Sequence, residues 1–276
     1  MPWFDTTTDG TRLHHIDYGP ADGPVLVFVN STYFGTEMWE RQMLPLAVAG
    51  YRCVSFDRRG HGRSDDVWGG FDLDTLADDL AAFLHHLDLR DVTLVAHSFG
   101  CAEAVRCLTR HGSGRVARIA LVAGITPGLV RTPDNPDGLA PETVAAASAV
   151  IHRDRHTFFA DGTDGFFGIG LPGNDISRPM ARHLADRCAV ATARGATGVV
   201  DLLRELDVAA ELKDIDVPAL VVHGTHDESA PLDLTGRRTA ALLPGADLRI
   251  YEYGAHGLVF THAERLNADL REFMAR

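Results

Sequence analysis

The chain has 276 residues, of which 45% are hydrophobic, and it carries a formal charge of −12. This length fits a single α/β domain with an insertion, and the apolar content is enough for a large core without disulfides or a structural metal. The acidic balance argues against nucleic acid and anionic membrane surfaces as partners, because both require a basic face. We therefore expect a small-molecule partner, and the sequence leaves a homo-oligomer open.

The first ten residues, MPWFDTTTDG, have neither a basic start nor an apolar core, so we expect no secretory signal. The longest strongly apolar runs, VLVFV and IALVAG, are too short to span a bilayer. The four cysteines show no C-x-x-C spacing, so we expect them to be small buried residues in a reducing compartment. The alternative is that Cys101 is a reactive thiol. The cysteines are Cys53, Cys101, Cys107 and Cys188. Together these features predict a cytoplasmic protein.

Strand-like and helix-like segments alternate along the first 124 residues. The continuous apolar run VLVFVN at 25–30 is typical of a strand that is buried on both faces of a parallel sheet. Alternation with short links indicates a parallel sheet with right-handed crossovers. We expect strands at 11–18, 25–30, 51–57, 91–96 and 117–124, and helices at 37–49, 74–89 and 99–111.

The alternation stops in the middle of the chain and resumes near its end. Residues 125–212 begin with a turn-rich stretch and contain the Gly-rich run FFADGTDGFFGIGLPG, and no strand is evident there. We therefore predict a helical cap at 125–212, inserted between the sixth and seventh strands of a core formed by 1–124 and 213–276. Helices are expected at 141–160, 177–210, 232–243 and from about 262, and strands at 217–224 and 246–253.

One serine stands between a fully apolar strand and a helix, in the run TLVAHSFGCAEAV at 93–105. A strained turn at this point would aim the Ser98 hydroxyl out of the carboxyl edge of the sheet. Such a turn requires small residues two positions away on either side. Gly100 meets this requirement, and Ala96 adds one methyl where the pattern G-x-S-x-G has glycine. Ser98 is the candidate nucleophile, and a strand–helix junction with a chance serine is the alternative.

A nucleophilic serine requires a base, and the base requires an orienting acid. In this topology the order along the chain is serine, acid, histidine. Asp227 follows one apolar strand in HGTHDESAP, and His256 follows the next in YEYGAHGL, both at the sheet edge where Ser98 is expected. We predict a Ser98–Asp227–His256 triad. The alternatives are a turn aspartate and a helix-capping histidine, and Glu228 is a less favoured acid.

Other polar residues near these strand ends have different interpretations. His223 and His226 flank Asp227, but no H-E-x-x-H pair or comparable ligand set is present, so we predict no metal site. In SFDRRGHGRSD at 55–65, Asp57 and the arginines are expected to hold neighbouring loops through charge-assisted hydrogen bonds. His61 is expected to be structural.

Backbone N–H donors and the side chains of a pocket are both expected around Ser98. The helix that follows Ser98 places the Phe99 N–H to stabilise an oxyanion, and the loop NSTYFGTEMW at 30–39 is expected to supply the Thr32 N–H as a second donor. That loop can also be a simple connection. A substrate pocket is expected between the sheet and the cap, and its candidate wall residues are Tyr33, Phe34, Phe158, Phe159, Phe166, Phe167 and Leu258. The alternative is that the aromatic residues of the cap only form the cap's own core.

These motifs resemble the α/β-hydrolases, and more narrowly the cofactor-free haloperoxidase/esterase/perhydrolase group. FDRRGHGRSD is similar to that group's loop after the fourth strand nearly letter for letter, as is the C-terminal run that begins DVPALVVHGTHDESAP, and Glu103 stands five residues after Ser98 as in the group. The resemblance covers most of the chain outside the cap. It implies a mostly parallel eight-stranded sheet flanked by helices, a cap after strand 6, an oxyanion hole of Thr32 and Phe99 N–H groups, and no cofactor.

Two segments depart from the group's pattern. Asn30-Ser31-Thr32-Tyr33 replaces H-G-[FW]-P, and Asn30-Ser31 with Met38-Trp39 is similar to the N-S-L-G-T…MW segment of 3-oxoadipate enol-lactone hydrolases. The group's G-x-S-x-G-G-G becomes AHSFGCA. Neither change removes a catalytic group, but both are expected to reshape the walls beside Ser98 and leave the substrate open.

The leading hypothesis is a serine hydrolase that cleaves a carboxylic ester or lactone through an acyl-enzyme. The related perhydrolases release a peracid when peroxide replaces water, so perhydrolysis is a further activity that the resemblance implies. One alternative is an enol-lactone hydrolase. Others are a lyase, a cofactor-free dioxygenase or a cyclase, in which His256 and Asp227 act as the base, and a binding protein without turnover.

Overall fold

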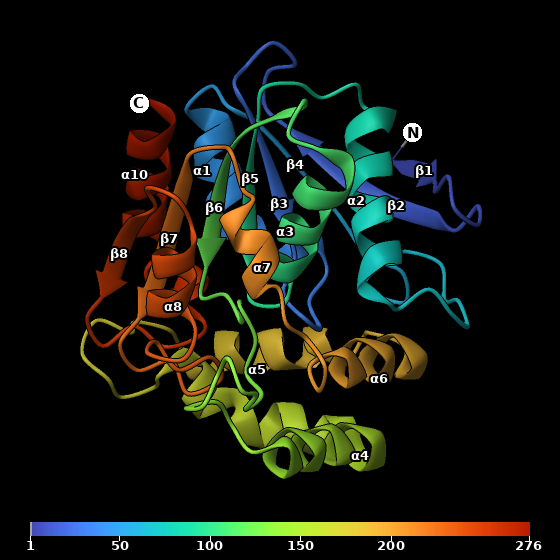
Figure 1. The fold of residues 1–276 in the computed structure, drawn as a ribbon. Coiled ribbons are helices and arrows are strands. Elements are labelled where there is room, and N and C mark those ends of the chain that lie inside the picture. Colours follow the sequence, from blue (N-terminus) through green and yellow to red (C-terminus); the bar gives the residue numbers. More distant parts are fainter. Residues whose placement is uncertain (1) are drawn as a thin grey trace.

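Apolar runs without polar alternation form the centre of the sheet, because a strand that is covered on both faces has no polar side. The structure is a computed structural model that describes residues 2–276, and it contains one eight-stranded sheet in the order β1-β2-β4-β3-β5-β6-β7-β8 (Figure 1). The strands are β1 (Trp3–Asp5), β2 (Arg12–Tyr18), β3 (Val25–Val29), β4 (Arg52–Phe56), β5 (Val92–His97), β6 (Val116–Val122), β7 (Ala219–Gly224) and β8 (Asp247–Tyr251).

The sheet is parallel from β4 to β8, and only β1 and β2 run antiparallel to their neighbours. This confirms the mostly parallel eight-stranded sheet. The sequence interpretation missed β1, which pairs Trp3 with His14 at the edge of the sheet. Three residues are too short a segment to show a period-2 pattern.

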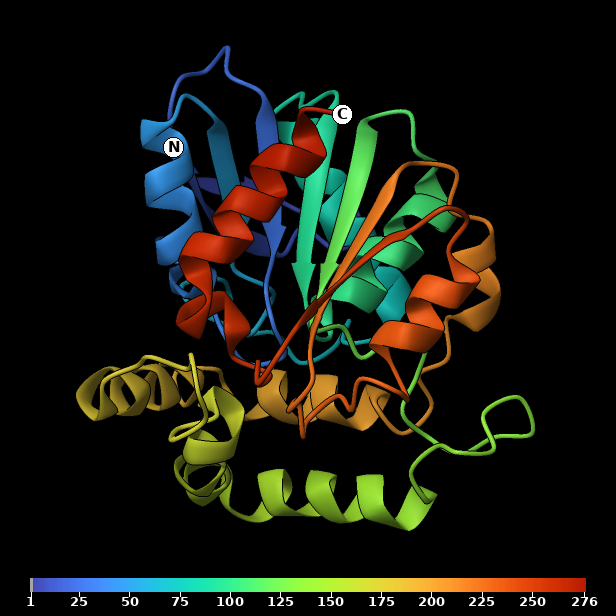
Figure 2. The ribbon, with the colours of Figure 1, turned by 90° about the vertical axis from the view of Figure 1, so that its left-hand side faces the viewer.

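Helices cover both faces of the sheet (Figures 1 and 2). α1 and α10 lie together on one face, and α2, α3, α7 and α8 lie on the other. The helices outside the segment between β6 and β7 are η1 (Thr36–Trp39), α1 (Glu40–Val48), α2 (Leu73–His86), α3 (Gly100–His111), α8 (Gly236–Leu242), α9 (Leu258–Thr261) and α10 (Ala263–Met274). The expected helix at 232–243 is shorter than predicted, because residues 232–235 form turns.

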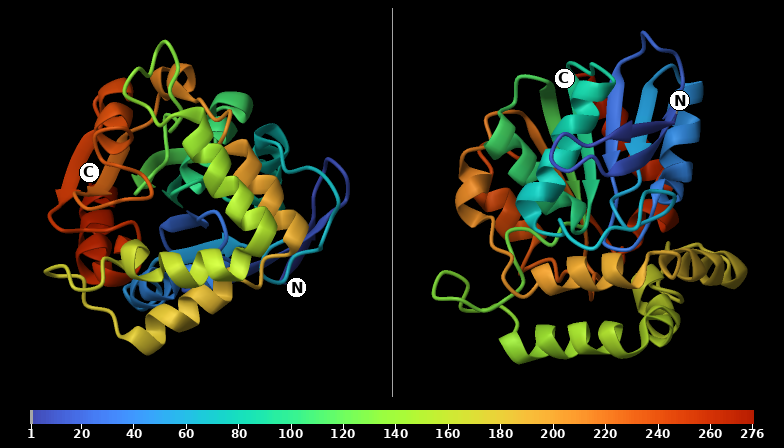
Figure 3. Two further views of the ribbon diagram at one scale, coloured as in Figure 1. Left: turned by 90° about the horizontal axis from the view of Figure 1, so that it is seen from below. Right: turned by 90° about the vertical axis from the view of Figure 1, so that its right-hand side faces the viewer.

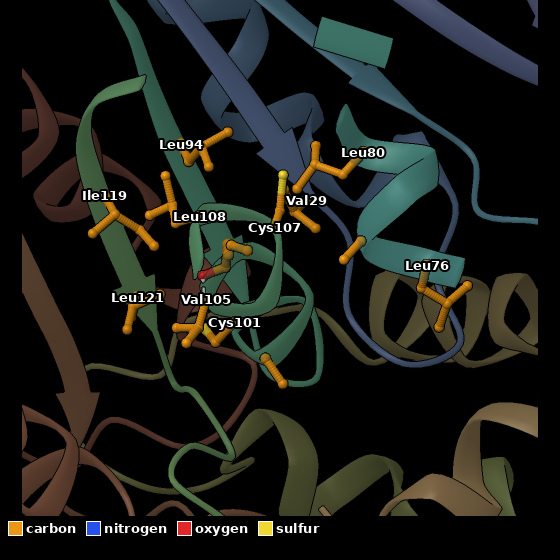
Figure 4. Close-up of a cluster of buried hydrophobic side chains, with 14 of the residues drawn as sticks. Val29, Leu76, Leu80, Leu94, Cys101, Val105, Cys107, Leu108, Ile119 and Leu121 are labelled. Carbon is orange, nitrogen blue, oxygen red and sulfur yellow. Dashed lines mark hydrogen bonds between the residues drawn. The ribbon is translucent and has the colours of Figure 1, made fainter. Parts of the chain in front are cut away.

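Two hydrophobic clusters fill the space between the sheet and its helices. In the first, side chains of α2 and α3 pack against β3, β5 and β6 (Figure 4). Leu94 and Ile119 come from the sheet, while Val105, Leu108 and Leu80 come from the helices. This packing fixes α3 against the sheet, and α3 begins directly after Ser98.

The segment between β6 and β7 is helical; its helices α4 to α6 lie across the carboxyl ends of the parallel strands, whereas α7 lies on the face of the sheet beside α3 and α8 (Figures 1, 2 and 3). It contains two isolated β-bridges and no regular strand among the described residues. Its helices are α4 (Pro141–Phe167), α5 (Arg178–Cys188), α6 (Ala193–Leu202) and α7 (Ala209–Lys213). The division of the chain into a core and a cap at 125 and 212 stays a prediction.

α4 is longer than the helix predicted at 141–160. It bends at Asp154, whose backbone is extended (φ −159°, ψ 84°), and the Asp154 carboxylate accepts the Thr157 N–H at 3.0 Å. An aspartate that accepts from the residue three positions later acts as an N-cap, so the helix restarts there. The helix then continues through Gly162 and Gly165 until Gly168, which adopts the left-handed conformation. The N-cap at Asp154 therefore allows α4 to continue through Gly162 and Gly165, although these glycines had suggested a loop.

A close glycine contact joins α6 to the loop after β4. The Thr192 N–H donates to the Gly60 carbonyl at 2.8 Å, and a Cβ on Gly195 would lie 2.6 Å from that carbonyl oxygen. Gly60 itself has φ +70°, where a side chain is strained. The helix and the loop approach this closely only because both positions lack side chains.

We expect Gly195→Ala to push α6 away from the loop and to lower Tm by about 3–8 °C, because overpacking costs about 1–3 kcal/mol. Gly162→Ala is the control, since a Cβ there meets nothing within 4 Å and alanine favours the helix. Thermal unfolding followed by circular dichroism measures both variants. Equal Tm values for the two would contradict the importance of the glycine contact.

Candidate active site

Ser98 occupies a strained turn between β5 and α3. Its φ is +56°, a left-handed conformation that is uncommon for a residue with a side chain, and its N–H donates to the Val122 carbonyl at 3.1 Å. A Cβ on Gly100 would lie 2.5 Å from the Asn30 carbonyl oxygen, so glycine is required there. Ala96 is fully buried in the first hydrophobic cluster. The turn therefore needs Gly100 and accommodates the methyl of Ala96.

Three side chains from three strand ends form a chain of hydrogen bonds. His256 Nε2 lies 2.9 Å from Ser98 Oγ, and His256 Nδ1 lies 2.7 Å from Asp227 Oδ2. All three residues are buried. The structure thus brings together the three residues that the sequence predicted as a triad, and their catalytic roles stay a prediction.

Asp227 is held by more than His256. Its Oδ1 accepts the Ala230 N–H at 2.7 Å, and His223 Nε2 lies 3.3 Å from Oδ2. Burial alone would raise the pKa of this carboxyl, but the neighbouring His256 and His223 hold it well below its ordinary value. The carboxylate is therefore ionised and fixed in orientation.

His97 supports the loop of His256 from behind. Its Nε2 donates to the His256 carbonyl at 2.9 Å, and the two imidazole rings lie 5.0 Å apart. Its Nδ1 is buried and has no hydrogen-bond partner among residues 2–276. Burial lowers the pKa of His97 to about 3, with a further lowering by His256. His97 is thus a neutral donor that positions the candidate base, a role that the sequence analysis did not assign.

Two backbone N–H groups lie beside Ser98 without an acceptor in the described chain, those of Thr32 and Phe99. In a trans peptide the N–H points away from the carbonyl of the preceding residue. The Ser31 carbonyl accepts from Arg58 at 3.0 Å, and the Ser98 carbonyl accepts from Cys101 at 3.1 Å. These bonds anchor both carbonyls on the far side, which leaves the two N–H groups free for a developing oxyanion.

Arg58 is the centre of this anchoring. It donates to both carboxylate oxygens of Glu103, with Nη2–Oε2 at 2.9 Å, and to the carbonyls of Asn30, Ser31 and Thr32. His61 Nε2 also lies 2.9 Å from the Thr32 carbonyl. The expectation that this region holds neighbouring loops through charge-assisted hydrogen bonds is confirmed.

Asp57 holds the same region from another side. Its carboxylate accepts the Thr36 N–H at 2.6 Å and the Arg63 N–H at 3.0 Å. His14 also lies 3.3 Å from it. Asp57 therefore ties η1 to the loop after β4, as the sequence indicated.

A cavity of about 350 Å³ opens above Ser98 and His256, between the sheet and α4 to α6. Its wall includes six of the aromatic residues expected from the sequence. These are Tyr33, Phe34, Phe158, Phe159, Phe166 and Phe167. Leu258 does not contribute to this wall; it is fully buried in the second hydrophobic cluster.

The structure corrects the expectation that the small residues around Ser98 in AHSFGCA reshape the cavity wall. Ala96, Cys101 and Ala102 are fully buried in the first hydrophobic cluster rather than on the cavity wall, so they do not shape it. Cys101 Sγ donates to the Ala96 carbonyl at 3.3 Å, and burial raises the pKa of this thiol. A buried thiol with a raised pKa is a poor nucleophile, which disfavours a reactive Cys101.

Several wall residues have no signal in the sequence. They come from the turn-rich stretch after β6, from the cap helices and from the residues after Asp227. Isolated apolar residues among prolines and glycines show no periodicity, so only their place beside Ser98 reveals them. The main examples are Ile125, Leu129, Leu139, Val144, Val200, Leu203, Glu228 and Ser229.

Two other kinds of feature are absent from residues 2–276. No group of three or more metal-ligating side chains is present in that range. None of its helices has the length and apolar character needed to cross a bilayer.

The comparisons with known proteins agree with this fold. The alpha/beta hydrolase family model matches residues 26–269, which is most of the chain. The chain belongs to the alpha/beta hydrolase family. This alpha/beta hydrolase is 39% identical over 271 residues to the non-heme chloroperoxidase CPO-A1 of Kitasatospora aureofaciens, covering 98% of each chain. It is 34% identical over 272 residues to the bifunctional esterase/perhydrolase DCH of Acinetobacter calcoaceticus, covering 98% of this chain and 99% of that one.

Solved structures and a weaker sequence match extend the comparison. An esterase from Exiguobacterium antarcticum superposes with a TM-score of 0.93 at 25% identity, over 100% of both chains. The 3-oxoadipate enol-lactonase 2 of Acinetobacter baylyi is 29% identical over 241 residues, which is 82% of each chain. The group predicted from the sequence, including its lesser similarity to enol-lactone hydrolases, is confirmed.

The two small residues flanking Ser98 give a matched test of the turn. We expect Ala96→Gly to leave ester turnover within a few-fold and to cost roughly 1 kcal/mol of stability, because it removes one buried methyl. Gly100→Ala should abolish most activity, because its Cβ collides with the backbone of Asn30. Ester turnover and urea unfolding measure both effects. A large change in turnover for Ala96→Gly would show that the methyl has a catalytic role.

Two buried histidines predict acid-sensitive stability. Burial lowers the pKa of His97 to about 3 and of His61 to about 4, so both are neutral when folded and become protonated on unfolding in mild acid. Their stabilising effect is complete above the unfolded pKa of about 6.5 and is lost as pH falls toward the folded pKa, by roughly 2–3 kcal/mol each at pH 4.5.

Urea unfolding at pH 7 and pH 4.5 tests this dependence. His97→Phe should reduce the acid-induced loss by about 2–3 kcal/mol, since phenylalanine has no proton to bind. His85→Asn, at an exposed position, is the control. An unchanged loss in His97→Phe would mean that His97 is not buried and neutral in the folded protein.

Proposed function

We propose that this alpha/beta hydrolase is a serine hydrolase that cleaves carboxylic esters or lactones through an acyl-enzyme on Ser98. The observation that carries the proposal is the hydrogen-bonded series Ser98–His256–Asp227 at the floor of an apolar cavity. The 34% identity to an esterase/perhydrolase supports the same chemistry.

The first half-reaction forms the acyl-enzyme. Ser98 Oγ attacks the carbonyl carbon while His256 Nε2 takes its proton, and Asp227 holds the Nδ1–H of the ring and stabilises the imidazolium. The carbonyl oxygen becomes an oxyanion, which accepts from the Thr32 and Phe99 N–H groups. Each such donor contributes about 3 kcal/mol to the transition state.

The second half-reaction releases the acyl group, after His256 has given its proton to the leaving alkoxide and the departure of the alcohol has completed the acyl-enzyme. Water then attacks the acyl carbon with His256 again as base, and collapse of this second tetrahedral intermediate returns the proton to Ser98 Oγ and releases the acid. Hydrogen peroxide in place of water gives a peracid as product. The same groups serve both nucleophiles, so perhydrolysis is proposed as a secondary activity.

The oxyanion donors favour acyl transfer over simple proton abstraction. A lyase, a cofactor-free dioxygenase or a cyclase that uses His256 and Asp227 as a base has no need of a serine within 2.9 Å of the imidazole. The proposed partner is a small ester or lactone. The four buried, unpaired cysteines fit a reducing compartment, so we also propose a cytoplasmic location.

Ser98→Ala tests the nucleophile. We expect kcat for aryl esters to fall by more than about 10³-fold, because the acyl-enzyme no longer forms. A fluorophosphonate probe should give one adduct on Ser98 in the native chain and none in the variant, as measured by intact-protein mass spectrometry. Turnover rates for aryl esters, for lactones and for peracid formation, measured side by side, rank the three reactions.

Two outcomes would contradict the proposal. A loss in Ser98→Ala of only a few-fold favours a proton-transfer enzyme in which Ser98 positions the substrate. Absence of an adduct in folded native protein favours a binding protein.

A further inference from the structure

The wall of the cavity over Ser98 carries little charge, and the charge that it carries is negative. Among the residues that form the wall, Glu228 is the only carboxylate, and none is lysine or arginine. The other wall residues are aliphatic, aromatic or neutral polar side chains, together with His256. A substrate carboxylate would therefore meet no opposite charge in this cavity.

The buried cations behind the wall do not compensate for this lack. Arg58 lies behind the Thr32 loop, but its guanidinium is paired with Glu103 and its remaining donors bind backbone carbonyls. His61 lies beside it, and burial and Arg58 lower its pKa to about 4, so it is uncharged near neutral pH. No positive charge from these groups is left for a substrate.

Glu228 adds a repulsive contribution at the mouth of the cavity. Its Oε2 lies 3.2 Å from the position of a Cβ on Gly165, so the carboxylate stands against α4 at the edge of the cap. Its side chain is exposed to solvent and forms no hydrogen bond or ion pair with the described part of the chain, so no cation of the protein neutralises it. An anion that enters past α4 approaches an uncompensated negative charge.

Among the neutral polar groups on the wall, the Tyr33 hydroxyl is a buried donor. The Tyr33 hydroxyl has no hydrogen-bond partner within residues 2–276, and its ring packs against Phe158 and Phe159 at centroid distances of 6.2 and 4.9 Å. Burial raises the pKa of this phenol, so it keeps its proton. A phenol O–H matches an uncharged acceptor such as an ether, ester or ketone oxygen.

From these observations, and resting on the proposed ester hydrolysis, we infer that the site selects uncharged esters and lactones and excludes substrates that retain a free carboxylate, with Glu228 as a specificity-determining residue. Burying a carboxylate without a cationic partner is strongly unfavourable, whereas the apolar wall stabilises a neutral acyl or alcohol group. A lactone with a free carboxylate is therefore a poor substrate here.

Three aryl esters of matched size test the charge selection. The neutral substrates are 4-nitrophenyl pentanoate and methyl 4-nitrophenyl glutarate, and the charged substrate is mono-4-nitrophenyl glutarate. We expect kcat/KM for the charged ester to be at least about 100-fold lower than for the neutral glutarate diester, mainly through KM. Values within about 3-fold of each other would overturn the inference.

Two pairs of variants locate the selection on the wall, and the readout is the ratio of kcat/KM for the charged ester to that for the neutral diester. Glu228→Gln should raise the ratio about 3–10-fold, while Glu264→Gln, which removes the same charge from the exposed face of α10, should not change it. Thr143→Arg places a cation on the wall at the first turn of α4 and should raise the ratio at least about 10-fold over Thr143→Gln. Equal ratios for Glu228→Gln and Glu264→Gln would overturn the role of Glu228.

A binding measurement separates this inference from the proposed function. If none of the three esters is hydrolysed, the proposed function fails. The charge selection is then measured as the affinity of Ser98→Ala for dimethyl glutarate and for monomethyl glutarate, by isothermal titration calorimetry. The neutral diester should bind at least about 30-fold more tightly. Equal affinities would overturn the inference whether or not the esters are hydrolysed.

Discussion

The buried pair of Arg58 and Glu103 is the interaction on which the geometry of the site depends. Arg58 comes from the loop after β4, Glu103 from the first turn of α3, and the carbonyls that Arg58 also binds come from the loop after β3. Taking two charges out of water is favourable only if nearly all their hydrogen-bonding groups are satisfied. Because three segments meet at one guanidinium, the Thr32 N–H keeps its orientation beside Ser98.

The same pair explains why the cavity is so weakly charged. The positive charge needed to hold the loops is placed behind the Thr32 loop and is neutralised there by Glu103. His97 and His61 perform comparable tasks as neutral groups, since burial lowers the pKa of each to about 3 and about 4. The scaffold thus orients the loop that carries the Thr32 N–H without placing a lysine or arginine on the cavity wall.

The sequence predicted the parts of the fold that depend on local patterns. The apolar runs of β3, β5 and β7 and the serine turn at Ser98 are continuous signals, and the structure places them as expected. β1 is only three residues long, and α4 continues through Gly162 because Asp154 restarts the helix by capping Thr157. Short edge strands and capped helices depend on contacts or single hydrogen bonds that a periodicity cannot show.

In the candidate site, too, some residues could be predicted from local sequence patterns and others depend on contacts in space. Ser98, Asp227 and His256 could be predicted because strand ends in a parallel sheet share one edge. The cavity wall could be predicted only in part, since aromatic pairs in the cap stood out whereas Ile125 and Leu129 lie among turn residues. The hydrogen bond of His97 to the His256 carbonyl crosses 159 residues of sequence. Such a contact follows from how β5 and the loop after β8 meet in space, which the composition of neither segment reveals.

Ala96, where the elbow pattern has glycine, packs in the core and does not line the cavity. Its carbonyl accepts from the thiol of Cys101, and Cys101 in turn fills the space beside Gly124, where a Cβ would lie 2.9 Å from the sulfur. Ala96, Cys101 and Gly124 therefore fit together on the core side of α3, away from the cavity. Ala96 and Cys101 are compatible with the strained turn at Ser98, because Gly124 at the end of the neighbouring strand β6 leaves room for them. The residues that line the cavity stand on the opposite side of Ser98, in the loop after β3, in α4 to α6 and at Glu228.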